Sequence, residues 1–153
     1  MYRRYEANGS MGGGAMTSSA KGVISLISTV AIRPYIYDFT FGTIGTPSDS
    51  VITLSVSRAT SMTAGTSCTS VTPSPLDSID AASTSSSGSA WTTQPSVGVT
   101  VFQVGLNVRA TYRWVAAPGG ELICPATANA GLLVNALSPA YTLDANATIY
   151  FAE

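Results

Sequence analysis

The side chains that most often perform catalysis are scarce in this chain. Its 153 residues include no histidine, and Lys21 is its one lysine. Without histidine the chain lacks the usual general base of serine and cysteine nucleophiles, and it lacks the commonest ligand of zinc, copper and iron. Lys21 follows a stretch rich in glycine and serine, which is a poor place for the desolvated amine of a Schiff base. Nucleophilic and histidine-dependent chemistry are therefore not expected.

Paired carboxylates are the remaining route to catalysis, because a glycosidase needs only two of them, held about 5–10 Å apart. Three acidic residues lie within the predicted framework, namely Asp38, Glu121 and Asp144. Each stands beside a turn or at the end of a predicted strand, where a solvated acid is ordinary. A glycosidase stays as the enzymatic alternative, and the main prediction is a protein without catalytic residues.

Metal binding is not expected either. Asp77 and Asp80 are close in sequence, but a calcium cage takes about six to eight oxygen ligands and this segment offers few. Cys68 and Cys124 are far apart and lack the further ligands of a structural zinc site. We interpret both cysteines as small apolar residues, and the sequence leaves open whether they form a disulfide. We predict no cofactor and no metal.

Alternation with a period of two, which is typical of half-buried strands, dominates the rest of the sequence. In residues 34–42 four aromatic residues occupy every second position and are predicted to share one face. No longer window has the helical period. About eight or nine strands are predicted: clear ones over residues 34–42, 50–58, 106–114 and 146–152, and weaker ones over 23–30, 66–72, 97–104, 121–124 and 132–137.

Many short strands without crossover helices indicate antiparallel sheets that pack face to face. We therefore predict an all-β fold, an antiparallel β-sandwich, with the jelly roll as its eight-stranded form. The core is predicted from the inward positions of the strands, which are Tyr37, Phe39, Leu54, Val56, Val108, Tyr112, Trp114, Ile149 and Phe151.

Two segments lack the strand pattern. Residues 1–20 join a short tag, MYRRYE, to a stretch rich in glycine and serine, so we predict a flexible N-terminal arm before a single sandwich domain over residues 21–153. Residues 72–94 are predicted to form a long loop, rich in serine and threonine, that has room for one helical turn. Near its end, Trp91 either packs onto the sandwich, which is the interpretation we prefer, or contacts another subunit.

The composition favours contact with other protein copies. Only 10% of the residues are charged and the net charge is −1, so a free monomer would be poorly protected from self-association. A chain without a basic excess is not expected to bind nucleic acid, and no apolar run reaches the roughly 18 residues of a membrane span. We predict a homo-oligomer, most simply a trimer.

Tyrosine, tryptophan and arginine dominate the energetics of protein interfaces. Arg109 and Arg113 are predicted to share the polar face of the strand over residues 106–114, where they could hold carboxylates of a neighbouring subunit. The alternative is that this face is merely solvated. The candidate interface residues are Tyr2, Arg3, Arg4, Tyr5, Trp91, Arg109 and Arg113.

Several short motifs are similar to those of small structural proteins encoded by tailed bacteriophages. They are LNVRATYRWVAAPGGEL at residues 106–122, CPATA at 124–128 and TIYFAE at 148–153, with RAT at 58–60, AGT at 64–66 and PSPLD at 73–77. The resemblance runs from about residue 36 to the end of the chain. It is weakest in the serine-rich loop and absent from the arm.

The resemblance implies a capsid decoration (cement) protein, which has a sandwich or jelly-roll fold and no catalytic residues. Such proteins sit as trimers on the outside of the shell, where they bridge capsid subunits. The expected partners are the major capsid protein and further copies of the chain, and the expected location is the capsid surface after assembly in the host cytoplasm.

The alternative function is a tail- or fibre-associated binding module of a kind that recognises carbohydrate. Such a module should display exposed aromatic residues beside carboxylates on one face. The alternation predicts instead that the aromatic residues are buried, so the sequence favours the decoration protein.

Overall fold

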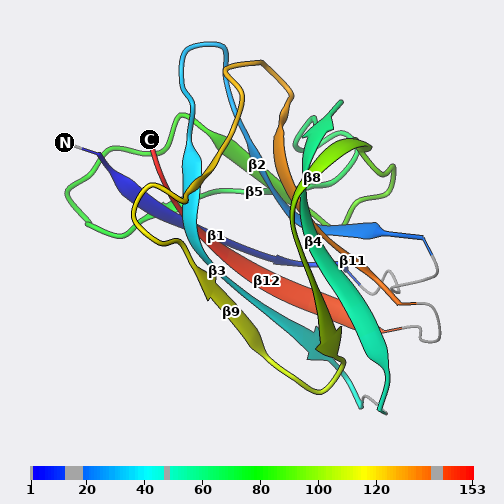
Figure 1. Cartoon of the computed structure of the whole chain (residues 1–153). Coiled ribbons are helices and arrows are strands. Elements are labelled where there is room, and N and C mark those ends of the chain that lie inside the picture. The colour runs from blue at the N-terminus through cyan, green and yellow to red at the C-terminus, as the bar shows by residue number, and fades with distance from the viewer. Residues whose placement is uncertain (1, 13–18, 47–48, 139–142) are drawn as a thin grey trace.

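The computed structural model describes residues 2–12, 19–46, 49–138 and 143–153. These residues form twelve strands in two antiparallel sheets that pack face to face (Figure 1). The predicted all-β sandwich is confirmed. Within the described ranges no helix is long and apolar enough to cross a membrane.

Each sheet has six strands. Sheet A contains β1 (Arg4–Ser10), β3 (Tyr35–Ile44), β6 (Ser74–Pro75), β9 (Tyr112–Val115), β10 (Leu122–Ile123) and β12 (Asp144–Ala152). Sheet B contains β2 (Lys21–Ile27), β4 (Val51–Thr60), β5 (Thr69–Val71), β7 (Ser86–Ser89), β8 (Ser96–Asn107) and β11 (Gly131–Leu137).

The strand order is that of a jelly roll. Sheet A runs β10-β3-β12-β1-β6, with β9 also paired to β3, and sheet B runs β5-β7-β2-β11-β4-β8. The eight principal strands of the sandwich form two rows, β1-β12-β3-β9 in sheet A and β2-β11-β4-β8 in sheet B. Apart from β4 and β8, which are both in sheet B, successive principal strands alternate between the two sheets, in the order of a jelly roll. The short strands β5, β6, β7 and β10 are additions to this plan.

The main core lies between the two sheets and contains most of the residues predicted for it. Buried as predicted are Phe39, Leu54, Val56, Val108, Ile149 and Phe151. Tyr37, Tyr112 and Trp114 are half-buried, which the alternation did not predict.

A β-bulge explains the position of Tyr37. Along β12, Tyr150 faces Asp38, but the next residue, Phe151, faces Ile36. Tyr37 is therefore an extra residue in β3, and it reverses the alternation of the strand. As a result the tyrosines at and before the bulge lie on the outer face, while the two phenylalanines after it point into the core. The prediction that all four aromatic residues share one face is wrong.

The strand predicted over residues 106–114 is in fact two strands in different sheets. A turn follows β8, in which the carbonyl of Asn107 accepts from the N–H of Ala110 at 2.9 Å and its Oδ1 accepts from the N–H of Arg109 at 2.9 Å. The chain then enters sheet A as β9. Both strands line the same core, so the alternation continues through the turn and gives no sign of the break.

The N-terminal segment is a strand of the sandwich rather than a flexible arm. β1 lies between β12 and β6 and pairs with β12 from Arg4 to Ser10. Tyr5 is fully buried and its ring stacks on that of Phe151, with 5.5 Å between centroids. Because β1 buries its inward side chains, the gain exceeds the entropy cost of ordering it. The prediction of a flexible arm is therefore wrong for residues 4–10. The predicted arm also includes residues 13–18, which lie outside the described residues.

The predicted loop over residues 72–94 contains two strands. Within it, β7 inserts between β5 and β2, where the hydroxyl of Ser25 donates to the carbonyl of Gly88 at 3.2 Å and accepts from its N–H at 3.1 Å. A Cβ on Gly88 would lie 2.3 Å from the Sγ of Cys68, so the strand requires glycine there. Residues 77–82 contain a hydrogen-bonded turn and no helix.

A second, smaller apolar cluster covers part of the outer face of sheet B. It consists of Ile27, Ala59, Met62, Cys68, Trp91 and Leu133. Trp91 thus packs onto the sandwich, as the preferred interpretation predicted. Cys124 lies in the main core, and neither it nor Cys68 is in a disulfide, so both are small buried residues.

Candidate assembly interface

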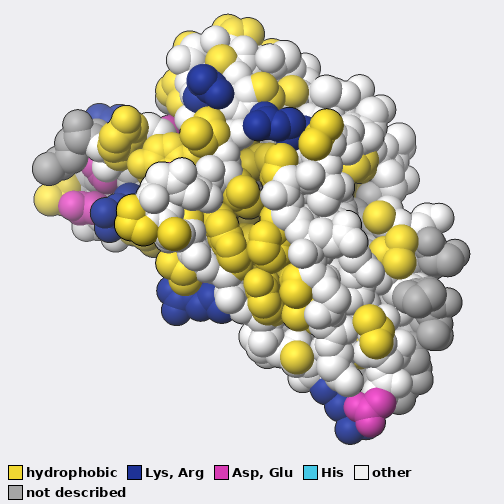
Figure 2. Space-filling view, viewed as in Figure 1, with side chains coloured by type: hydrophobic (Ala, Val, Ile, Leu, Met, Phe, Trp, Pro, Cys, Tyr) yellow, Lys and Arg dark blue, Asp and Glu magenta, His cyan; other side chains and the backbone are white. Residues whose placement is uncertain are grey.

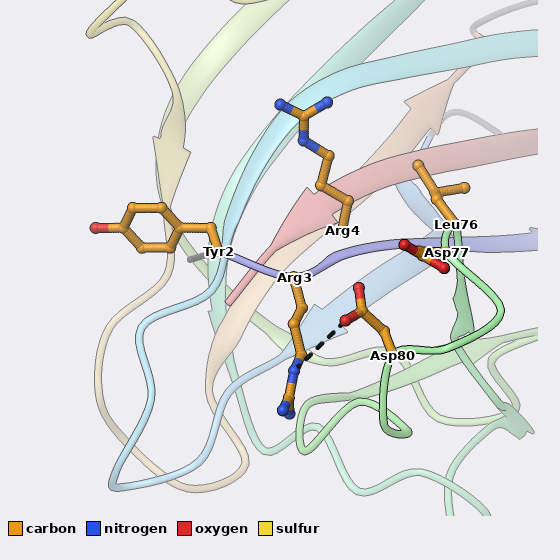
Figure 3. A pocket seen from close by; sticks show the side chains of 6 residues that line it. All are labelled: Tyr2, Arg3, Arg4, Leu76, Asp77 and Asp80. Atoms are coloured by element: carbon orange, nitrogen blue, oxygen red, sulfur yellow. Dashed lines mark ion pairs between the residues drawn. The ribbon is translucent and has the colours of Figure 1, made fainter.

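Three of the predicted interface residues lie together at the start of β1. Tyr2, Arg3 and Arg4 line an open hollow of about 650 Å³. Figure 3 shows Arg3 pointing toward the segment that follows β6, while Arg4 points to the other side of the strand. The Nε of Arg3 is 3.7 Å from the Oδ1 of Asp80. The lining is completed by Leu76, Asp77 and Asp80.

This N-terminal hollow is fixed by the backbone around it. The N–H of Arg3 donates to the carbonyl of Glu153 at 3.2 Å, and the N–H of Glu153 donates to the carbonyl of Arg3 at 3.2 Å. Tyr2 is 72% exposed and meets the ring of Tyr35 edge-on, with 5.6 Å between centroids. The side chains predicted for a flexible arm are therefore presented at the end of a paired strand.

Two predicted interface residues are not at the surface. Tyr5 and Trp91 are both buried within their own chain. The Nε1–H of Trp91 has no hydrogen-bond partner among the described residues. Burial in the two apolar clusters accounts for both side chains, so neither is available to a neighbouring subunit.

Arg113 is engaged within its own chain. Its Nη2 lies 2.5 Å from the Oδ2 of Asp38 and its Nε lies 3.1 Å from the Oδ1, while the Asp38 side chain is only 8% exposed. Hydrogen bonding to this carboxylate raises the pKa of the Arg113 guanidinium. Arg109 lies instead in the turn after β8, with its Nε 3.4 Å from the Oδ1 of Asp49. The predicted pair on one strand face is therefore wrong.

The free edge of β8 is a surface that the sequence did not reveal. β8 is the last strand of sheet B and pairs only with β4, so nothing in the described ranges pairs with the other edge of its twelve residues. None of these residues is charged. Val99 is 69% exposed, and Val97 is half-exposed beside it. The segment was predicted to be a strand, but its place at the edge depends on the order of the whole sheet.

Beside this edge, aromatic side chains fill the opening between β8 and β9. Phe39 lies 5.4 Å from Trp114 and 5.6 Å from Phe102 between ring centroids, and Phe102 lies 5.8 Å from Trp114. Figure 2 shows a band of hydrophobic side chains in this opening. We call it the apolar seam; it consists of the half-buried residues Phe102, Val104, Leu106, Tyr112, Trp114 and Leu122.

The three framework carboxylates have structural partners. Asp38 is paired with Arg113, as described. The Oδ1 of Asp144 accepts from two backbone N–H groups at 3.1 and 2.8 Å, and Glu121 accepts from one at 3.4 Å. In the part of the chain that the structure describes, no three His, Cys, Asp or Glu side chains gather so that they could hold a metal ion.

Comparisons with known proteins give no family model, no curated protein and no solved structure that matches this chain.

Proposed function

We propose that this chain is a structural virion protein of a tailed bacteriophage, a capsid decoration (cement) protein that stabilises the head by bridging capsid subunits. Its partners are the major capsid protein and further copies of itself in a homotrimer on the capsid surface. It has no catalytic role and needs no cofactor. The motifs of the second half of the chain suggest the family, and the free edge of β8 with its apolar seam is the observation that carries an assembly role.

An exposed, uncharged edge strand is a liability for a monomer because it can pair with other chains. Natural sheets usually protect such an edge with charged residues, with proline or with a covering loop. β8 contains neither a charged residue nor proline, and the apolar seam lies next to it. Coverage by another copy of the chain would remove this liability, which supports an assembled state.

A trimer would use two different surfaces of each copy, because contacts around a threefold axis are heterologous. In this arrangement the β8 edge and the apolar seam of one copy meet another face of the next copy. The N-terminal hollow lies at the end of the molecule where both chain termini meet (Figure 1). Since Tyr2 and Arg3 are of the types that dominate interfaces, we assign this hollow to the capsid contact. Many such contacts over a shell sum to a large avidity.

Antibody labelling of purified virions, viewed in negative stain, tests the proposal. We expect label over the whole head. Label confined to the tail would replace this proposal with the tail-associated module, and virions without label would contradict both. Stripped heads should also rebind the added protein, and they should bind the double variant Tyr2→Ala/Arg3→Ala at least about tenfold more weakly. Arg109→Ala, which changes an exposed arginine in the turn after β8, is the matched control and should rebind normally.

One observation favours the tail- or fibre-associated binding module as a second candidate. The bulge in β3 places Tyr35 and Tyr37 on the outer face of sheet A, where Asp38 also lies. Aromatic side chains beside a carboxylate on one face are the arrangement expected of a carbohydrate-recognising module. The virion labelling separates this candidate from the decoration protein.

A further inference from the structure

The outer face of sheet A is a broad surface built by neighbouring strands in register. β12 forms its middle, with β1 on one side and β3 on the other. Because directly opposite residues of antiparallel strands point to the same side, their outward side chains form rows across the face. These rows are Glu6–Tyr150–Asp38, Asn8–Thr148–Thr40 and Ser10–Asn146–Gly42.

Two open hollows lie along these rows. They measure about 400 and 330 Å³, and both are lined by Asn146 and Thr148. No charged side chain lines either hollow, and every polar side chain in the two linings carries a hydroxyl or an amide group. Gly42 leaves room beside Asn146, since a Cβ there would come within 3.3 Å of its Oδ1. Such groups both donate and accept hydrogen bonds, which suits a ligand that carries many hydroxyl groups.

Asp38 and Arg4 on the same face have partners within the chain. Asp38 is held by Arg113, and the guanidinium of Arg4 lies 5.9 Å from the centre of the Tyr37 ring. An ionic ligand would have to compete with these contacts. A neutral ligand leaves them intact and can use the carboxylate of Glu6 as one further acceptor.

Tyrosine rings border the polar rows. Tyr37 and Tyr150 are both half-buried residues of this face. Desolvation raises the pKa of the Tyr37 phenol, the nearby Arg4 lowers it, and Asp38 and Tyr150 raise it again, so the net shift is upward. The phenol therefore keeps its proton at neutral pH and can donate it in a hydrogen bond. Aromatic rings offer flat apolar surfaces on which the C–H face of a sugar ring can pack.

We propose that the outer face of sheet A is a binding site for a neutral oligosaccharide, whose sugar rings pack on Tyr37 and Tyr150 and whose hydroxyl groups bind Asn146, Thr148 and Asn8. The site does not depend on where in the virion the chain is placed. On a decoration protein it would attach the head to a glycan-coated surface, and on a tail-associated module it would contribute to recognition of the host.

An array of neutral and anionic oligosaccharides tests this site with the full chain. We expect binding to at least one neutral class among gluco-, manno-, galacto- and N-acetylhexosamine chains. Tyr150→Ala and Thr148→Ala should each weaken that binding at least about tenfold. Thr60→Ala, which changes an exposed strand threonine of sheet B, is the matched control and should bind as the wild type does. Thr148→Ala and Asn146→Ala keep the test valid if Tyr150→Ala fails to fold, which a circular dichroism melt shows.

Three results would overturn the site. In the first, the protein binds only anionic chains on the array, or none. In the second, it binds neutral chains, but Tyr150→Ala and Thr148→Ala leave that binding unchanged. In the third, these variants change the sedimentation of the protein and not its glycan binding. The last result would mean that another copy of the chain covers this face. The virion labelling is a separate measurement. The proposal of a glycan site can therefore be refuted while the proposal of a decoration protein is supported, and the reverse.

Discussion

At the scale of single residues, Glu153 joins the last strand to the serine-rich segment. Its carboxylate accepts four hydrogen bonds, from the hydroxyls of Ser83 and Ser85 at 3.2 and 2.7 Å and from the N–H groups of Thr84 and Ser85 at 2.7 and 3.1 Å. Partial burial by itself raises the pKa of this carboxyl, but the hydrogen bonds from Ser85 and Thr84 outweigh it, and the pKa is lowered overall. The ionised form is therefore the one that holds the segment in place.

Glu153→Gln should destabilise the protein by about 1 kcal/mol at pH 7, which is less than a buried hydrogen-bonded charge would contribute because this carboxylate is partly solvated. A lowered folded-state pKa means that the contribution is present above the unfolded pKa of about 4.5 and is lost as the pH falls through the folded value. Urea unfolding at pH 7 and about pH 3 measures it. The gap between wild type and variant should close at the lower pH, and Glu121→Gln should show no comparable gap. A gap of equal size at both pH values would contradict the role of the charge.

At the scale of elements, β1 makes the N-terminal residues part of the folded sandwich. The strand fills a place between β12 and β6, and its buried Tyr5 belongs to the main core. Removing β1 would expose the edge of β12 that pairs with it and would leave a cavity where Tyr5 is buried. The N-terminal segment is therefore part of what stabilises the sandwich.

A chain that begins at Lys21 should not fold cooperatively. Loss of one large core aromatic typically costs about 3–5 kcal/mol, and a whole strand exceeds that, while small domains are stable by only about 5–15 kcal/mol. Near-ultraviolet circular dichroism and a thermal melt give the readout. A chain that begins at Arg3 lacks only residues before β1 and should fold normally. A cooperative melt from the shorter chain would show that β1 is dispensable.

Strands with large apolar residues at alternate positions could be predicted from the sequence. In β4, Ile52, Leu54 and Val56 alternate with polar residues, and β12 has the same pattern in Ile149 and Phe151. Both strands have one face against the core, which is the situation that the period of two describes. Their bounds differ from the prediction by only a few residues.

Strands that bury small or polar residues could not be predicted in this way. β7 has the sequence SSGS, and its Ser87 is fully buried, with its hydroxyl donating a hydrogen bond to the carbonyl of Ser25 in β2. β1 buries Tyr5 but next to it only small residues, so its pattern is weak. Of the candidate interface, Tyr2, Arg3 and Arg4 do lie at the surface, but the β8 edge depends on which strands pair, and nothing in a strand's own sequence encodes that order.

At the scale of the whole molecule, the β8 edge and the apolar seam should hold copies of the chain together. Replacing Val99 and Val101 by lysine places two charges where an adjoining copy would bury them, and desolvation of an unpaired charge is costly. We expect the dissociation constant of the oligomer to rise at least about hundredfold, which corresponds to about 2.7 kcal/mol.

Sedimentation over a range of protein concentrations measures this change. Val30→Lys is the matched control, since Val30 is 72% exposed and lies outside the strands. It should sediment as the wild type does, and all three proteins should melt at similar temperatures. A wild type that stays monomeric at every concentration, or a double variant that assembles normally, would show that the edge is not the contact.

The pairing of the first long strand with the last one also has a consequence for synthesis. β1 lies beside β12 and pairs with it over its whole length, so the two strands are the first and the last of the described strands to be synthesised. Until β12 emerges, β1 and β3 lack the strand between them and sheet A is incomplete. During that interval the nascent chain keeps apolar faces and unpaired edges exposed, the condition in which chains aggregate or require chaperones. Sheet A can therefore be completed only after β12 has been synthesised.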